Sequence, residues 1–134
     1  MRIVPEHTRK LLTDKKEQTE RDWGASLQVY QYREFYFSFQ KKEFSKGNRR
    51  VEPNQAEQRL LRFLIGNRGR ILARRDLLRH IWAESTVLAD ESALSAAVKH
   101  LRDKLEDNPG SPRYIKTVYG VGYTWADGRN GAEE

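Results

Sequence analysis

The sequence contains no cysteine, which excludes a disulfide framework and a thiolate metal site and favours a reducing compartment such as the cytoplasm. Its three histidines show no metal-ligand spacing, so we expect no metal. No apolar run is long enough to span a membrane, and the N-terminus lacks the apolar core of a signal peptide. These absences predict a cytoplasmic protein with no membrane partner and no cofactor.

The residue sets of common enzymes are also missing. No Ser-His-Asp set and no pair of catalytic carboxylates is evident, and surface ion pairs are the simpler explanation of the acidic cluster at 103–107. Gly120-Val121-Gly122 has the spacing that opens a dinucleotide-binding loop. However, Trp125 stands where the third glycine is needed, and no helix follows. We therefore predict no enzyme activity, and a turn between two strands at these glycines.

What the chain does contain is positive charge. Lys and Arg number 25 against 19 Asp and Glu, and the formal net charge is +6. A basic small protein favours an anionic partner, most often nucleic acid, although charge alone is a weak signal. Several arginines between residues 68 and 79, Arg74 among them, are candidates to bind phosphates beside a groove.

The 134 residues predict a single domain with additional length at its ends. We place the domain at 26–127, after an N-terminal extension at 1–25 that forms an arm or a peripheral helix, and before a tail at 128–134. Alternating apolar and polar residues at 26–52 predict a small antiparallel sheet, and Lys-Gly-Asn at 46–48 predicts one of its turns.

Three helices are predicted downstream of the sheet. Asn54 and Glu57 form a capping-box pattern for the first, which ends at 66–69. The second is short, and a loop at 83–90 separates it from a third at 91–106, with Asp90 as N-cap. Two strands joined at the glycines close the chain. This order predicts an α+β fold of the winged helix-turn-helix type, in which the C-terminal β-hairpin at 113–126 is the wing.

The third predicted helix has two faces. An apolar stripe is formed by Leu94, Val98, Leu101 and Leu105, and the opposite face carries Ser92, Ser95, Lys99 and Arg102, with His100 beside them. Short residues let a helix backbone approach the major groove, and long donors reach base edges or phosphates. A solvated surface helix would have the same pattern, but its position between a helix and a hairpin favours recognition of DNA.

From Asn54 onward the chain resembles the OmpR/PhoB family of winged-helix effector domains. The matching stretches are NQAEQRLLRFLIGNRGRILARRDLLRHIWA, LSAAVKHLRDKLEDNPGSPRYIKTV and YGVGYTW. The resemblance implies a sequence-specific regulator of transcription that binds double-stranded DNA, with helix 91–106 in the major groove and the wing on the adjacent backbone or minor groove. It also implies contact of loop 83–90 with RNA polymerase and a homodimer on DNA.

The resemblance also implies roles for single residues. It places Lys99, His100 and Arg102 of the helix and Thr117 and Tyr123 of the wing toward DNA. Ser95 on the same helix face, and Lys116 and Tyr119 on the wing, are further candidates for DNA contact by their position. Thr117 would bond a phosphate, and Tyr123 would support or contact the backbone.

This sequence departs from the family at several positions. The family often has Arg and Asp where this chain has Ser92 and Ser95, a basic residue at the position of Tyr119, and a Ser or Thr cap at the position of Ala73. Fewer cations leave open an alternative function, a winged-helix module that binds a protein and has lost specific DNA binding. Residues 1–52 are too short for the receiver domain usual in this family, so either a stand-alone regulator or a piece of a longer one is possible, and the initiating Met favours the first.

Overall fold

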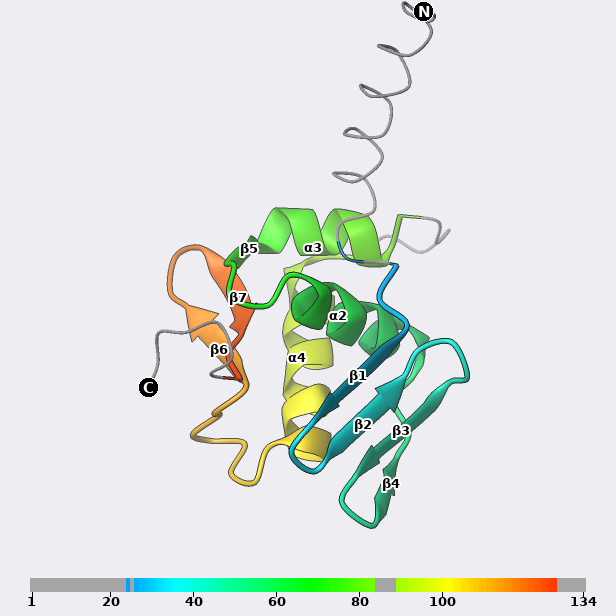
Figure 1. Cartoon of the computed structure of the whole chain (residues 1–134). Coiled ribbons are helices and arrows are strands. Elements are labelled where there is room, and N and C mark those ends of the chain that lie inside the picture. The colour runs from blue at the N-terminus through cyan, green and yellow to red at the C-terminus, as the bar shows by residue number, and fades with distance from the viewer. Residues whose placement is uncertain (1–23, 25, 84–88, 128–134) are drawn as a thin grey trace, which may run out of the picture.

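The computed structural model describes residue 24 and residues 26–83 and 89–127, and helices and strands are labelled as in Figure 1. Four short strands come first and pair in chain order as an antiparallel meander. They are β1 (Val29–Tyr32), β2 (Phe35–Ser38), β3 (Glu43–Lys46) and β4 (Arg49–Val51). The predicted N-terminal sheet is therefore confirmed. Its turn between β3 and β4 lies at the predicted glycine, where Gly47 has a φ of +61°.

The sheet buries one face because apolar residues alternate along its strands. Tyr30, Phe35, Phe37, Phe44 and Val51 are all buried. Neighbouring strands bring these side chains together in cross-strand pairs, such as Tyr30 with Phe37. The sheet thus presents a mostly aromatic surface to the helices, and it forms one layer against α2 and α4 (Figure 1).

The three predicted helices are present among the described residues. They are α2 (Gln55–Gly66), α3 (Arg74–Ile81) and α4 (Glu91–Leu105), and the two-residue strand β5 (Leu72–Ala73) precedes α3. Asn54 caps α2 in a complete capping box with Glu57, and Asp90 caps α4, as the sequence predicts. Ala73 makes no side-chain cap on α3.

The C-terminal hairpin consists of β6 (Ile115–Val118) and β7 (Gly122–Trp125), and β7 also pairs with β5. Only Gly120 serves the turn, where its φ is +80°. Gly122, which was also assigned to the turn, lies within β7 instead. A Cβ there would overlap the carbonyl oxygen of Leu72, so this glycine allows β5 to approach closely.

The wing and the N-terminal sheet share one core around Trp125, which is fully buried. Its ring packs edge-on against Tyr30 at 5.8 Å and stacks on Tyr114 at 5.4 Å. Its indole N–H donates to the Tyr30 hydroxyl at 3.1 Å, and that hydroxyl donates to the buried Asp127 at 2.6 Å. The base of the wing is therefore fixed to the sheet.

Three predictions fall on residues that the structure does not describe. They are the N-terminal extension at 1–25, most of the loop at 83–90, and the tail at 128–134. No helix among the described residues is long and apolar enough to cross a membrane.

Candidate nucleic-acid interface

The N-terminal half of α4 presents short polar and small side chains to solvent. Ser92, Ser95, Ala96 and Lys99 are all exposed, whereas the predicted apolar stripe of Leu94, Val98, Leu101 and Leu105 is buried in the core. Few large side chains therefore separate the backbone of this half of the helix from a partner. This exposed face of α4 is the surface that the sequence assigns to DNA.

The first turn of this helix is well capped. Oδ1 of Asp90 accepts hydrogen bonds from the N–H groups of Ser92 and Ala93 and from the Ser92 hydroxyl at 2.9 Å. The bond from the Ser92 hydroxyl, and then that from Ala93, lower the pKa of the Asp90 carboxyl. Asp90 is thus ionised at neutral pH.

The longer side chains of α4 are largely bonded within the protein. Lys99 forms an exposed ion pair with Asp103 at 3.4 Å. His100 Nδ1 lies 3.3 Å from Oε2 of Glu57, although the imidazole remains about half exposed. Lys104 bonds the other oxygen of Glu57 at 2.5 Å. The helix carries three cationic residues and two carboxylates, so its surface is not uniformly basic.

Arg102 points toward the wing. Its Nε and Nη2 donate to the carbonyl oxygen of Ile115 at 3.0 and 2.8 Å, and Nη2 also donates to Oγ1 of Thr117 at 2.8 Å. The sequence places both Arg102 and Thr117 toward DNA. The structure joins them to each other instead and leaves the Thr117 side chain half-buried.

Tyr123 is 5% exposed, so its ring belongs to the core of the wing. The guanidinium carbons of Arg74 and Arg102 lie 5.5 and 5.9 Å from the ring centroid, within cation–π range. Of the two roles considered for Tyr123, support and contact, its burial favours support. Arg74 is itself half-buried and reaches from the start of α3 to the wing.

The tip of the wing is the most exposed apolar part of the described surface. Tyr119 is 89% exposed and Val121 is 46% exposed, with Gly120 between them. Lys116 is also exposed, on the strand leading to the tip. Of the wing residues that the sequence assigns to DNA, Lys116 and Tyr119 are thus the accessible ones.

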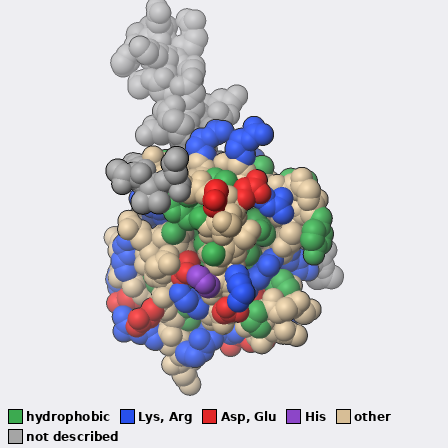
Figure 2. Space-filling model, turned by 180° about the vertical axis from the view of Figure 1, so that it is seen from behind, with side chains coloured by type: hydrophobic (Ala, Val, Ile, Leu, Met, Phe, Trp, Pro, Cys, Tyr) green, Lys and Arg blue, Asp and Glu red, His purple; other side chains and the backbone are tan. Residues whose placement is uncertain are grey.

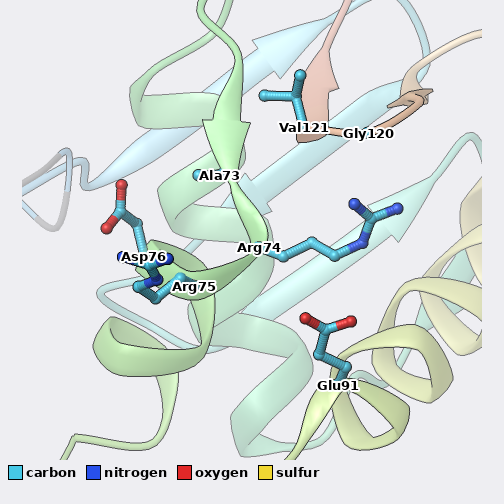
Figure 3. Close-up of a pocket in the computed structure, with 7 residues that line it drawn as sticks. All are labelled: Ala73, Arg74, Arg75, Asp76, Glu91, Gly120 and Val121. Carbon is cyan, nitrogen blue, oxygen red and sulfur yellow. The ribbon is translucent and has the colours of Figure 1, made fainter.

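A shallow hollow of about 480 Å³ lies between the wing tip and the starts of α3 and α4. Arg74 extends between Glu91 of α4 and the turn at Gly120 and Val121 (Figure 3). Arg75 and Asp76 also line the hollow, and their side chains point away from that of Arg74 (Figure 3). The wing tip and the starts of α3 and α4 therefore border the same part of the molecular surface. Viewed from the side opposite to that of Figure 1, basic and acidic side chains alternate over the molecule (Figure 2).

Sequence reasoning misses two buried carboxylates that contact α4 or belong to its end. Glu57 is recognised only as a capping residue, yet it also binds His100 and Lys104. Glu106 belongs to the acidic cluster that the sequence attributes to surface ion pairs. That interpretation is wrong for Glu106, which is 5% exposed and accepts backbone N–H groups from residues 113–115. In the sequence, the one signal for this role is that Glu106 directly follows the charged C-terminal turn of α4.

Within the part of the chain that the structure describes, no three His, Asp or Glu side chains gather as metal ligands would. The candidate interface consists of the exposed face of α4, the wing tip and the hollow between them.

Comparison with known proteins identifies relatives of this chain. Residues 48–125 match the family model described as "Transcriptional regulatory protein, C terminal". The transcriptional regulatory protein AfsQ1 of Streptomyces coelicolor is 42% identical over 79 residues, which are 59% of this chain and 35% of AfsQ1. The chain spans about a third of the length of the curated relatives that it matches, between 28% and 35% for three of them.

Solved structures with the same fold include two with clear similarity in sequence. The response regulator DrrB, an OmpR/PhoB homologue of Thermotoga maritima, matches with a TM-score of 0.68 at 27% identity, over 87% of this chain and 51% of DrrB. The DNA-binding domain of RstA from Klebsiella pneumoniae, solved in complex with the RstA box, matches with a TM-score of 0.63 at 26% identity, over 75% of this chain and 98% of that domain.

Proposed function

The chain belongs to the OmpR/PhoB-type family of C-terminal domains of transcriptional regulatory proteins, and we propose that it binds double-stranded DNA in a sequence-specific manner to regulate transcription. In this proposal α4 enters the major groove and the β6–β7 hairpin contacts the adjacent backbone or minor groove. The protein acts in the cytoplasm, at the nucleoid, and without enzymatic chemistry.

The exposed face of α4 is the observation that carries this proposal. Ser92, Ser95 and Ala96 are short and exposed along its N-terminal half, so the helix backbone can approach base edges. Ser95 can donate to or accept from a base, and Lys99 can reach a phosphate or guanine once it leaves Asp103. An exposed ion pair of this kind is worth less than about 1 kcal/mol, so breaking it costs little.

The wing supports the proposal because its tip borders the same hollow as the start of α4. Tyr119 and Lys116 are the exposed wing residues that would meet the sugar-phosphate backbone. The RstA domain, which has the same fold, was solved with its DNA box. From the family resemblance we further propose that the domain at 26–127 binds DNA as a unit and as a homodimer on two half-sites, and that loop 83–90 contacts RNA polymerase.

The alternative function is a winged-helix module that binds a protein. The observation that favours it is the internal bonding of Lys99, Arg102 and Lys104, which leaves few cations of α4 for phosphates. The two functions predict different responses to salt. DNA binding through phosphate contacts weakens linearly in log affinity as log salt rises.

Fluorescence anisotropy with duplexes from a randomised pool, at low and moderate salt, tests the proposal. We expect one duplex to be preferred, and affinity for it to fall with salt. Lys99→Ala should weaken binding, and Lys41→Ala, on the exposed turn between β2 and β3, is the matched control that should not. Equal binding of every duplex and of heparin would reject sequence-specific recognition.

A further inference from the structure

β6 is an edge strand, because the sheet order is β5-β7-β6. The backbone N–H and C=O of its first residue, Ile115, point away from β7, where another strand would otherwise pair. They are bonded instead by the side chains of Arg102 and Glu106. The carbonyl oxygen of Ile115 accepts two hydrogen bonds from Arg102, at 3.0 and 2.8 Å, and its N–H donates to Oε2 of Glu106 at 2.8 Å. Both backbone groups of Ile115 are therefore held, by Arg102 of α4 and by Glu106, the C-cap residue that follows it.

The same two side chains also bond residues on either side of Ile115. Glu106 also accepts from the N–H groups of Arg113 at 2.7 Å and Tyr114 at 3.0 Å. Arg102 also donates to the hydroxyl of Thr117. Residues 113, 114, 115 and 117 are thus each bonded to Arg102 of α4 or to Glu106, its C-cap residue.

The hydrogen bonds from Arg102 and to Glu106 are stronger than ordinary backbone hydrogen bonds. Each involves a charged group, and charge-assisted hydrogen bonds are about twice as strong as neutral ones. Glu106 is buried, and Arg102 is half-buried over the ring of Tyr123. β7 is paired on both sides, with β5 and β6, whereas among the described strands β6 is paired with another on one side alone. The direction of the wing therefore depends on what holds its base.

We propose that Arg102 and Glu106 are positioning residues that fix the direction of the wing relative to α4, and that Arg102 does not read a base. This inference rests on the proposed DNA-binding function. Tyr119 lies four residues beyond Ile115, about 13 Å along an extended strand, so a small pivot at Ile115 moves the tip substantially. The two side chains thus set the spacing between the major-groove contact and the wing contact.

The first test uses the protein without DNA. Arg102→Met keeps the aliphatic stem and removes every donor, and Thr117→Val is a near-isosteric change that removes one acceptor and preserves the fold. Lys99→Met is the matched control on the exposed face of α4. We expect lower NMR order parameters at 116–122 in Arg102→Met, a smaller decrease in the same residues in Thr117→Val, and none in Lys99→Met. Unchanged wing order in both of the first two variants would overturn the proposal.

The second test uses the duplex that the unmodified chain selects from a randomised pool. We expect Arg102→Met to weaken binding roughly tenfold, with an unchanged slope of log affinity against log salt. A slope smaller by about one would instead identify Arg102 as a phosphate contact, and a loss limited to one base pair would identify a base reader. Either result overturns the positioning role. If no duplex is selected, the proposed function fails, while the wing-order measurement still decides the positioning role.

Discussion

Glu57 of α2 and His100 of α4 lie 3.3 Å apart, measured from Oε2 to Nδ1. The same carboxylate caps its own helix, because Oε1 accepts the Asn54 N–H at 3.0 Å, and it bonds Lys104. Glu57 is almost fully buried, at 1% exposure. One side chain thus joins the start of α2 to two successive turns of the proposed recognition helix.

The first prediction concerns this carboxylate. Glu57→Ala removes half of the capping box and leaves Lys104 without its partner. We expect the free energy of unfolding to fall by about 2 kcal/mol, which is less than the roughly 3–5 kcal/mol of a fully buried ion pair because Lys104 is one third exposed. Urea denaturation measures the change. Glu43→Ala on β3 is exposed and should cost no more than about 0.5 kcal/mol. Equal effects of the two variants would contradict the prediction.

The second prediction separates the two wing glycines. Gly122→Ala places a Cβ on the carbonyl oxygen of Leu72, so we expect β5 to leave β7 and stability to fall by about 3 kcal/mol. In Gly120→Ala the new Cβ meets no atom within 4 Å, and the backbone φ of +80° is the one source of strain. We expect this strain to lower stability by about 1 kcal/mol. Thermal unfolding of both variants gives the comparison. If Gly120→Ala were the more destabilising, the assignment of the close approach to Gly122 would be wrong.

Local signals in the sequence are enough to predict most of the fold. The caps at Asn54 and Asp90, the apolar stripe of α4 and the turn at Gly47 each depend on residues close together in the chain, and each is found where it is expected. Family membership, shown by the match over residues 48–125, agrees with the resemblance.

The internal bonds of the interface are not predictable in this way, because they join distant residues. Glu57 and Lys104 are 47 residues apart, and Arg102 and Thr117 lie on different elements. A helical face shows that Arg102 is off the core stripe, but not whether it turns to solvent or to the wing. Likewise, Gly-x-Gly spacing does not reveal that β5 passes beside the second glycine.

The third prediction concerns Tyr119, which is 89% exposed and contributes little to the core. Tyr119→Ala should change stability by no more than about 0.5 kcal/mol. It should weaken binding of the selected duplex without altering the salt dependence, because the side chain is uncharged. Tyr119→Arg should make the slope of log affinity against log salt steeper by about one, as an added phosphate contact would. Anisotropy titrations at several salt concentrations measure both. Unchanged affinity and slope in both variants would show that the wing tip stays away from DNA.

The last prediction concerns pH. Burial beside α2, where the imidazole packs edge-on to Phe63 at 5.6 Å, lowers the pKa of His80, and this outweighs the opposite influence of Asp76. The unfolded chain therefore takes up a proton near the ordinary value of 6.5, while the folded protein does so only at lower pH. The contribution of His80 to stability is complete above pH 6.5 and is lost as the pH falls below that value. Glutamine does not titrate, so the free energy of unfolding of His80→Gln should decline less between pH 7 and pH 5 than that of the unmodified protein. Between pH 7 and pH 8 the two proteins should show the same slope of unfolding free energy against pH, which is the internal control. Urea denaturation across this range measures the difference, and parallel profiles down to pH 5 would show that His80 titrates alike in the folded and unfolded states.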